Sequence, residues 1–543
     1  MRLASVDRAL AYGVALLVGL SMVALMLPWD TLTGTGGMFR YPVGDLPQNL
    51  GGHLAFQVPG WHWPPLRTPS LALPDGESVA MMDANPVLSI AAKLLCGLAG
   101  HPINLFGVWL GICLTLQAAG AVYVLRGFSG GTLPGGRLAT IATAAAAATL
   151  SVLLPEFLFR VIHINLMGQF LLLAALGISL RHSEGRPAPR FTTLLGLLTL
   201  AVFIHPYLFI FCALTLAIPA AHRLIRRQPG ARDALRNYAL AAQIPAGLFL
   251  LVNGSSGAGG GPGFGLYSMN LAGPFWPQRS GLFGATLPVL DATGYQHEGF
   301  NYLGAGVLLL LASAAICCLR LDRAGRAGVW HRHAGLIVVL AGMAALAITP
   351  RLTFGHAVIL PLTVPGLDRL FGVVRASGRA IWVVDFALIG ASLSLLARRL
   401  KPAPLITVLV TALLAQFLDT APLRQDAEAY FAGAGQAAPP VTLPAATSLL
   451  RIVPHCGGSE DAAADPIRLL AIRQGVQLAN ARLAHPPSDD VCAQTAADGL
   501  ATPVSAGEAR LFLPSLAPKV DPARLGAGTT CTPSPAGLLC THG

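Results

Sequence analysis

Long runs of apolar residues, separated by polar loops, recur along the first 418 positions of the chain. A helix needs roughly 20 apolar residues to cross the hydrocarbon core of a bilayer. The pattern therefore predicts a mainly α, polytopic helical membrane protein. We expect eleven transmembrane helices, at residues 9–28, 103–125, 138–154, 164–180, 191–204, 207–221, 238–252, 302–319, 334–349, 380–397 and 403–418.

The loops between these runs differ in charge, which predicts their sidedness. Cytoplasmic loops carry an excess of Lys and Arg, so we place the N-terminus and the short arginine-rich loops in the cytoplasm. Loops 181–190 and 222–237 then lie on the same side, which favours two crossings around His205 over one helix kinked at Pro206. The arginine-rich loops are 126–137, 181–190, 222–237, 320–333 and 398–401, and the long outer loops are 29–101, 253–301 and 350–379.

Composition agrees with a membrane protein. Hydrophobic residues make up 54% of the chain and charged residues 11%, whereas soluble domains carry about 25% charge. The net charge of +11 comes from arginines in the short loops, so it does not indicate nucleic-acid binding. The Arg-, Ala- and Gly-rich composition is typical of a GC-rich bacterial genome, and we expect the bacterial inner (plasma) membrane.

A change in composition near Asp419 predicts a domain boundary. Residues 1–418 form the expected transmembrane domain, and the polar, Pro- and Ala-rich residues 419–543 form a soluble extracytoplasmic domain. An outward-facing tail lies in an oxidising compartment, where disulfides form. Four cysteines allow three pairings, and nearness in sequence favours Cys456–Cys492 and Cys531–Cys540.

The first outer loop is predicted to contain two short interfacial helices, which the transmembrane domain includes. Leucines at 46, 50 and 54 and a valine at 58 repeat every four positions, which is typical of an amphipathic helix over about 46–58. A second helix over about 86–98 begins with Asn85 as N-cap and Pro86 at the first helical position. Its 13 residues are too few to span a bilayer.

Two acids in this loop have both a structural and a catalytic interpretation. Asp45 is either the N-cap of the first helix, in a capping box with Gln48, or a base that faces a cavity at the membrane surface. The two roles do not exclude each other. Asp83 is either a flank of the Asn85 cap or a second acid.

Further polar residues stand at the predicted outer ends of helices. Glu156, another acid candidate, can pair with Arg160 four residues later. Arg375 and Arg379, also four apart, can clamp a phosphate or reach lipid headgroups. Asp385 lies inside an apolar run, where a charge indicates a functional or paired role. The candidate substrate pocket comprises His53, Trp61, Arg160, His163, His205, Tyr207, Asn301 and Trp382.

Common nucleotide and metal motifs are absent from the sequence: there is no G-x-x-x-x-G-K-[ST], no H-E-x-x-H and no C-x-x-C. No metal-ligand set is therefore predicted. No strand precedes the glycine-rich run at 254–265, so we interpret it as a flexible outer loop and a candidate lid.

Six segments, taken in order and with their sidedness, resemble the C-type (GT-C) membrane glycosyltransferases, and specifically an uncharacterised bacterial family of that superfamily. They are GDLPQNLGGHLAF, MMDANPVLSIAAKLL, RVIHINLMGQF, HPYL, EGFNYLGAG and RASGRAIW. The resemblance implies a sugar donor on a polyprenyl phosphate, inversion at the anomeric centre and an essential acid in the first outer loop. Carried over, Asp45 becomes the general base, and Arg375 and Arg379 hold the departing lipid phosphate.

This sequence also departs from well-known members of that superfamily. In protein O-mannosyltransferases a second acid follows the first, but none follows Asp45 here. The tail also lacks the Trp-Trp-Asp motif that oligosaccharyltransferases carry. These departures argue against protein glycosylation at a sequon and against a required metal, so a divalent cation, Mg²⁺ or Mn²⁺, is only an open alternative. We therefore predict transfer of a sugar to a cell-envelope glycan or lipid acceptor, with membrane lipids as further partners.

Two other functions remain as alternatives. A polysaccharide or lipid transporter would show paired charges near the middle of the membrane and internal repeats, and Asp385 is the one feature that favours it. A non-catalytic envelope-assembly protein would have the same sequence pattern, with its acids serving only as caps.

Overall fold

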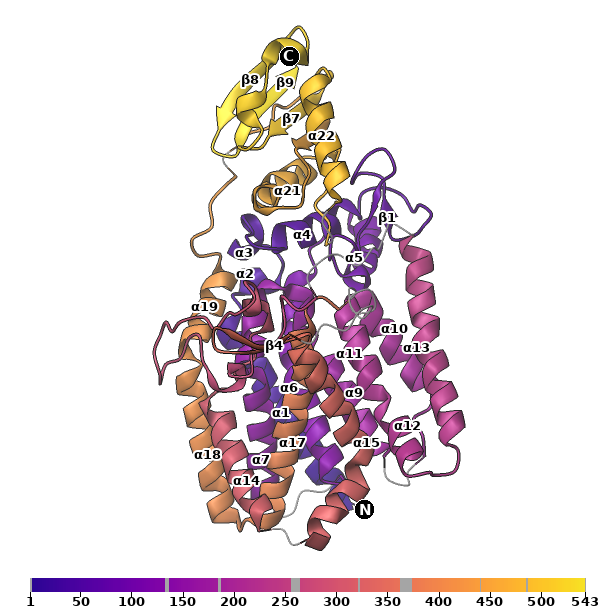
Figure 1. The fold of residues 1–543 in the computed structure, drawn as a ribbon, viewed down its shortest axis with the longest axis vertical. Helices are drawn as coiled ribbons and strands as arrows, with labels where there is room; N and C mark the ends of the chain where they lie inside the picture. Colours follow the sequence, from indigo (N-terminus) through magenta and orange to yellow (C-terminus); the bar gives the residue numbers. More distant parts are fainter. Residues whose placement is uncertain are drawn as a thin grey trace. The chain divides into compact units, whose positions relative to one another are not determined.

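The computed structural model describes residues 2–542 except 132–135, 184–186, 255–263, 321–322, 362–373, 440 and 485–486, and side chains from residue 6 onward except those of 321–326. Figure 1 traces the chain from end to end. Its residues group into two compact units. The helical unit comprises Met1–Leu27, Leu110–Gly247 and Gly259–Ala429, and the mixed unit comprises Pro28–Trp109, Leu248–Ala258 and Tyr430–Gly543.

Each of the eleven apolar runs forms a helix. Among the described residues, eight helices are long and apolar enough to cross a membrane, or nine if the bent pair at 136–152 and 155–162 is one span. Helices α10 and α14 are apolar but shorter. The helices are α1 (Arg2–Met26), α6 (Phe106–Phe128), α7 (Gly136–Val152), α9 (Phe170–Arg181), α10 (Phe191–Ile204), α11 (Pro206–Leu216), α13 (Ala231–Asn253), α14 (Ala305–Leu319), α15 (Arg323–Ile348), α17 (Trp382–Arg399) and α18 (Pro402–Asp419).

Several helices extend beyond the apolar runs that predicted them. Helix α13 begins at Ala231 and α15 at Arg323, both inside loops that were expected to be non-helical. A further helix, α12 (Ile218–Ile225), follows α11. Hydrophobicity marks where a helix enters the bilayer, whereas the helix itself continues through any residues of good helix propensity, here Arg and Ala. The chain breaks at His205 into two helices, α10 and α11, which pack against each other; that each of them crosses the membrane stays a prediction.

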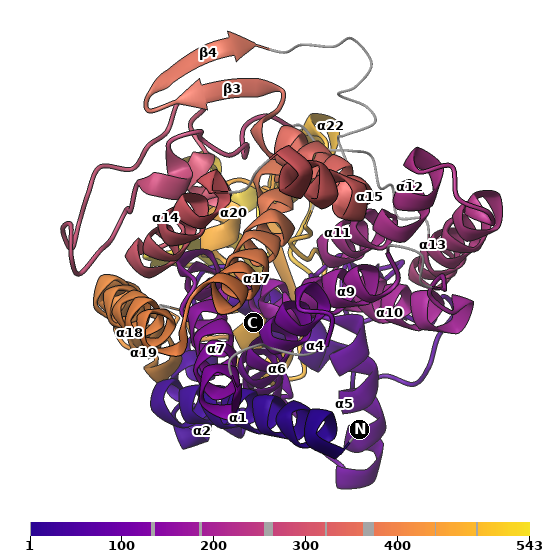
Figure 2. The ribbon, with the colours of Figure 1, turned by 90° about the horizontal axis from the view of Figure 1, so that it is seen from below.

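Small residues set the spacing of helices in the helical unit. A Cβ added to Gly120 of α6 would lie 2.9 Å from Leu173 Cβ of α9, and one added to Gly127 would lie 2.9 Å from Leu180 Cβ. Such glycines let helix backbones approach closely. Helix α17 packs against α7, α9, α14, α15 and α18, and Figure 2 shows these helices end-on.

Short turns connect the helices at one end of this unit. Pro155 follows α7, and the chain continues through α8 (Pro155–Leu158), η1 (Phe159–Ile162) and η2 (Ile164–Met167). The loops before α14 and α17 contain η3 (Gly273–Phe275), η4 (Gln296–Gly299), η5 (Ser377–Ile381) and an antiparallel hairpin of β3 (Arg351–Phe354) and β4 (Ala357–Pro361). These turns carry most of the polar residues discussed below.

The mixed unit combines the first long loop with most of the C-terminal region. The loop contains α2 (Trp29–Leu32), α3 (Gly37–Arg40), α4 (Leu46–Ala55), β1 (Arg67–Thr68), β2 (Glu77–Ser78) and α5 (Pro86–Ala99). Helix α4 ends three residues before the predicted 58, and α5 agrees with the helix predicted over 86–98. Helix α19 (Ala421–Ala432) leads from α18 into the C-terminal region.

The C-terminal region folds around a five-stranded mixed sheet of order β6-β5-β7-β9-β8. Strand β5 pairs in parallel with β6 and β7, whereas β9 is antiparallel to β7 and β8. Disulfides join Cys456 to Cys492 and Cys531 to Cys540, which confirms the predicted pairing. The elements are β5 (Leu449–Val453), α20 (Ser459–Ala463), α21 (Asp465–Arg473), β6 (Gln477–Leu478), α22 (Asp489–Ala501), β7 (Glu508–Phe512), η6 (Ala517–Lys519), η7 (Pro522–Leu525), β8 (Thr529–Ser534) and β9 (Gly537–His542).

Candidate functional site

Three basic side chains of the helical unit converge on one carboxylate, Glu298 of η4. Arg160 Nη1 and Arg379 Nη2 lie 2.8 and 2.7 Å from Glu298 Oε2. His163 Nε2 lies 3.0 Å from Glu298 Oε1, and Arg160 Nη2 also donates to the Glu298 carbonyl at 2.7 Å. We call these four residues the Glu298 cluster.

Two glycines allow the turns that carry the cluster to touch. A Cβ added to Gly378 of η5 would lie 2.9 Å from the Cα of Gly299 in η4 and equally close to the carbonyl oxygen of Tyr267. Real Cβ atoms are essentially never found so close to another heavy atom, so a larger residue would push η5 away from η4. The glycines therefore set the distance between Arg379 and Glu298.

Aromatic rings flank the two guanidinium groups. The Arg379 guanidinium lies 5.0 Å from the Tyr207 ring centroid, and that of Arg160 lies 5.6 Å from the Trp382 ring centroid. His205 stacks on Tyr207 with centroids 5.5 Å apart. The Tyr207 hydroxyl accepts a hydrogen bond from the Ala376 backbone N–H at 2.9 Å. Cation–π contacts of this kind hold a guanidinium in place while leaving its N–H donors available.

The electrostatics of the cluster favour anions. Burial alone would raise the pKa of Glu298, but Arg160 and Arg379, with His163, hold that pKa far below its ordinary value. One carboxylate faces two guanidinium groups, which are always protonated, so the cluster carries excess positive charge. Arg160 is fully buried and Arg379 nearly so. Paired guanidinium groups in such a setting recognise phosphate or carboxylate.

Most of the pocket residues expected at the outer helix ends gather here. Besides Arg379, these are Arg160, His163, His205, Tyr207 and Trp382. The central residue, Glu298, was missed, although it opens the segment EGFNYLGAG. A single acid in a long loop has no periodicity to mark it. Its only signal was its place in that segment.

The expected clamp of Arg375 and Arg379 is not formed as a helix face. Helix α17 begins at Trp382 and η5 begins at Ser377, so Arg375 precedes both elements. Arg375 instead acts electrostatically on Tyr267. The second guanidinium of the cluster comes from Arg160. Asn301 is buried and donates to Met269 Sδ at 2.8 Å.

Asp45 lies in the mixed unit, where it precedes α4. Its side chain makes no capping hydrogen bond, so the predicted capping box with Gln48 is wrong. Its Oδ1 accepts instead from Arg482 Nη2 at 3.4 Å, and 42% of the Asp45 side chain is exposed. Burial and the nearby Asp45 raise the pKa of Tyr430. Asp45 thus stands at the N-cap position of α4, with a partly exposed carboxylate that makes no capping bond.

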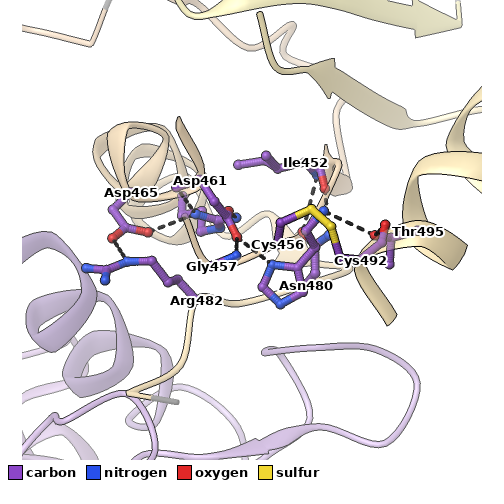
Figure 3. A network of polar contacts seen from close by, with 11 residues as sticks. Ile452, Cys456, Gly457, Asp461, Asp465, Asn480, Arg482, Cys492 and Thr495 are labelled. Carbon is purple, nitrogen blue, oxygen red and sulfur yellow. Dashed lines mark hydrogen bonds and ion pairs between the residues drawn. A yellow bond between two sulfur atoms is a disulfide. The ribbon is translucent and has the colours of Figure 1, made fainter. Parts of the chain in front are cut away.

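Arg482 connects Asp45 to a buried ionic network in the C-terminal region. Figure 3 shows this network from Arg482 to the Cys456–Cys492 disulfide. Arg482 Nε pairs with Asp465 Oδ2, and Arg468 pairs with both Asp465 and Asp461. Asp461 Oδ2 also accepts from His455 Nδ1 at 2.9 Å, beside the Cys456–Cys492 disulfide. Burial opposes ionisation of Asp461, but His455 and Arg468 hold its pKa below its ordinary value. Acids and bases alternate along the network, so most of its charges are compensated.

The other candidate residues of the first loop make contacts within that loop. His53 is fully buried, with its ring nitrogens 3.0 Å from Ser89 Oγ and 3.1 Å from the Ile103 carbonyl, and burial lowers its pKa to about 4. Trp61 is 53% exposed, with the Lys93 ammonium 4.9 Å from its ring centroid. Asn85 accepts a bond from the Leu88 N–H, which confirms it as the N-cap of α5. Asp83 stands in a turn with φ +52°.

Asp385 and Glu156 are both buried, and Asp385 Oδ2 and both carboxylate oxygens of Glu156 have no hydrogen-bond partner among the described residues. The glycine-rich candidate lid at 254–265 lies largely outside the described residues, which omit 255–263. Among the residues that the structure describes, no group of three or more His, Cys, Asp or Glu side chains is placed to hold a metal ion.

No curated protein and no solved structure matches the chain. A family model does match residues 16–421, a range that includes Asp45, the Glu298 cluster and Asp385 but not the disulfide-bonded C-terminal region. The match covers more than half of the 543 residues. The chain therefore belongs to the family described as a domain of unknown function (DUF6311).

Proposed function

We propose that this membrane protein is a glycosyltransferase. It transfers a sugar from a polyprenyl-phosphate donor to a cell-envelope glycan or lipid acceptor. The observation that carries the proposal is the convergence of Arg160, His163 and Arg379 on Glu298. The GT-C resemblance of the surrounding segments supports it.

The Glu298 cluster is suited to hold the phosphate of the donor. As the bond between the anomeric carbon and the phosphate oxygen breaks, negative charge grows on the leaving phosphate. Preorganised guanidinium groups stabilise such charge in the transition state. Glu298 occupies the cluster as an internal counter-ion and keeps Arg160 and Arg379 apart and oriented. A phosphate oxygen binds beside Glu298, where the two guanidinium groups converge.

Asp45 is the proposed general base. It accepts the proton of the acceptor hydroxyl as that oxygen forms its bond to the anomeric carbon and the lipid phosphate departs. An attack on the face opposite the phosphate inverts the anomeric centre. The partly exposed Asp45 carboxylate, oriented by Arg482, has the accessibility that this role needs. Arg482 belongs to the C-terminal region, for which we propose a part in acceptor binding.

The proposed orientation follows the arginine distribution. The N-terminus and arginine-rich loops face the cytoplasm, and the reaction takes place on the extracytoplasmic side of a bacterial inner membrane. The two disulfides support this placement of the C-terminal region because disulfides persist in oxidising compartments.

The proposal is tested in the chromosomal copy by comparing a deletion with Asp45→Asn. Cell-surface glycans are profiled by mass spectrometry, and membrane abundance of the protein is measured in parallel. We expect the same sugar to disappear from both strains while the Asn variant stays abundant. Because Asp45 makes no capping bond, Asn should fold normally. A deletion that leaves every glycan unchanged contradicts the glycosyltransferase function, and an Asn variant with wild-type glycans contradicts Asp45 as the base.

A proton-coupled transporter is the second candidate. The single observation that favours it is the burial of two acids, Glu156 and Asp385, whose oxygens lack hydrogen bonds among the described residues, because acids inside membrane segments often mark proton or ion pathways. A deletion strain with normal glycan synthesis but with polymer retained inside the cell would support this function instead.

A further inference from the structure

The β3–β4 hairpin of the helical unit presents a row of exposed apolar side chains. Phe354 of β3 and Val358, Ile359 and Leu360 of β4 are each between 42% and 58% exposed. All five residues of β4 are exposed, and successive residues of a strand point to opposite faces. We call these four side chains the hairpin patch. An apolar patch of this kind on a folded protein usually marks an interaction surface.

Polar residues hold the base and the tip of this hairpin to the helical unit. Gln296 Nε2 donates to Thr353 Oγ1 at 2.7 Å. The Asn270 side chain bonds twice to the Gly355 backbone, with Nδ2 donating to the carbonyl at 2.8 Å and Oδ1 accepting from the N–H at 3.1 Å. An isolated two-stranded hairpin is only marginally stable in water. These bonds fix its position but leave its apolar strand, β4, uncovered.

The chain enters the hairpin directly from a candidate membrane span. The apolar part of α15, Ala327–Ile348, has 22 residues and is therefore about 33 Å long. This length is enough to cross a hydrocarbon core of about 30 Å. Only Thr349 and Pro350 separate Ile348 from β3, which packs against α15. The hairpin thus lies at the level where α15 leaves the hydrocarbon core.

The hairpin also projects sideways from the helices. Figure 2 views the helices end-on, and β3 and β4 lie outside them, beyond α14 and α15. Figure 1 shows β4 near the level at which these helices end. Water covers the ends of a membrane-spanning bundle, whereas lipid surrounds its sides. A strand beside the helix ends therefore meets lipid.

The strands themselves indicate the depth of this contact. Among the described residues β4 pairs only with β3, so its other edge has backbone N–H and C=O groups that need partners. Open sheet edges do not occur in the hydrocarbon core, but water and headgroups satisfy them at the interface. Residues 351–361 contain one arginine, one histidine and no acidic residue. Apolar side chains beside an arginine are typical of segments that contact anionic headgroups.

Pairing with a second copy of the chain is disfavoured by the shape of this edge. The register of the hairpin shifts between Leu352 and Thr353, and Pro361 ends β4. Bulges and prolines blunt an edge strand against pairing with another strand. The edge is therefore suited to solvent and headgroups, and the apolar side chains to lipid.

We propose that the β3–β4 hairpin is a lipid-binding element, which lies in the headgroup interface with the hairpin patch against the acyl chains. Asn270 and Gln296 tie it to the loop that carries Glu298. The hairpin thereby sets the depth of the Glu298 cluster relative to the headgroups. This consequence rests on the proposed function, because a phosphate site at that depth takes a lipid-linked phosphate whose chain stays in the membrane.

Photocrosslinking of the full-length protein tests the lipid contact. The substitution Ile359→p-benzoylphenylalanine is made, and the protein is irradiated in nanodiscs of phosphatidylethanolamine and phosphatidylglycerol. Intact-protein mass spectrometry then detects lipid adducts. We expect adducts in a yield comparable to that from the same substitution at Leu17, an exposed residue of the α1 span. The same substitution at Val491, exposed on α22 in the region that we propose is soluble, should give none.

The other outcomes of this experiment overturn the proposal. Adducts at Leu17 with none at Ile359 show that the hairpin patch does not touch lipid. Covalent dimers of the Ile359 variant in place of lipid adducts show that a second copy covers the patch. Fragmentation of the adduct locates the new bond, which we expect near the glycerol end of the acyl chain. A bond confined to the chain terminus contradicts the interfacial depth. Size-exclusion chromatography checks the fold, and Val358 is the second position for the probe.

The consequence for the Glu298 cluster is tested separately with Asn270→Ala, which removes both bonds to Gly355. At matched protein abundance we expect this variant to restore less of the missing surface sugar to a deletion strain than wild type does. Its lipid adducts at position 359 should persist. Full restoration by Asn270→Ala contradicts the coupling alone. A deletion that changes no glycan contradicts the proposed function and leaves the lipid contact standing.

Discussion

Arg379 Nη2 lies 2.7 Å from Glu298 Oε2, the same oxygen that accepts a hydrogen bond from Arg160. Glu298 lies in η4 and Arg379 in η5, two turns that are far apart in sequence. The turns approach each other closely at two glycines, Gly299 and Gly378. One carboxylate thus fixes two guanidinium groups beside aromatic rings. This arrangement forms the proposed phosphate site.

Glu298→Gln should lower the stability of the helical unit by about 3 kcal/mol at pH 7, because it leaves two buried guanidinium groups without their counter-ion. The depressed pKa of Glu298 contributes stability that is present above its ordinary value near 4.5 and lost as pH falls. The difference from wild type should therefore begin to narrow only below about pH 4.5, so that pH 4 captures just the start of the change. Thermal unfolding in detergent at pH 7 and at pH 4 measures it. The exposed Glu428→Gln is the control, and equal melting of Glu298→Gln and wild type at pH 7 would contradict the ion-pair account.

Gly378→Ala should impair function more than it impairs folding. The added Cβ would lie 2.9 Å from the Gly299 Cα, so η5 must shift and carry Arg379 away from Glu298. We expect a helical content like that of wild type but a strong loss of the glycan product. Gly342→Ala, at a position of α15 where a Cβ meets nothing within 4 Å, is the matched control. A fully active Gly378→Ala protein would show that the spacing of the two turns is unimportant.

His53 should make the first loop less stable in acid. Burial lowers its pKa to about 4, against 6.5 in the unfolded chain. Between these values the unfolded chain binds a proton that the folded chain does not. The free energy of unfolding therefore decreases as the pH is lowered, by up to about 3 kcal/mol. Hydrogen exchange of peptides covering α4, measured from pH 7 to pH 4, checks the slope. His53→Gln should flatten it, and an unchanged slope in that variant would assign the effect to another group.

The two ends of the Asp45–Arg482 contact should respond differently to substitution. Arg482→Gln removes a partner from the buried Asp465 and should destabilise the C-terminal region by about 1–3 kcal/mol. Asp45→Asn removes only a partly exposed pair and should cost about 0.5 kcal/mol or less. Hydrogen exchange over β5–β7 of the full-length protein compares them. Equal effects of the two substitutions would show that Asp45 is part of the structural network.

Hydrophobic runs predicted the helices well because backbone N–H and C=O groups in an apolar setting must bond within their own segment, and a helix satisfies them all. They predicted helix ends poorly, as at Ala231 and Arg323, because polar residues continue a helix without any apolar signal. Nearness in sequence was enough to pair the four tail cysteines. The Asp45 capping box failed because the Asp45 backbone is already helical, with φ −86° and ψ −12°, whereas a capping side chain needs a more extended backbone.

The candidate site was predictable only in part. Arg160, His163, His205, Tyr207, Arg379 and Trp382 could be placed at outer helix ends because each adjoins an apolar run. Their meeting point could not, because Glu298 lies in a long loop whose path depends on contacts with η5.

The central claim is that Arg379 holds the lipid phosphate of the donor. A deletion strain is complemented with wild type, Arg379→Gln or Arg375→Gln, and the surface glycan is measured by mass spectrometry at matched protein abundance. The account predicts that wild type and Arg375→Gln restore the missing sugar, whereas Arg379→Gln restores less than about a hundredth of it, as expected when a transition-state charge contact is lost. Full restoration by Arg379→Gln would contradict the account.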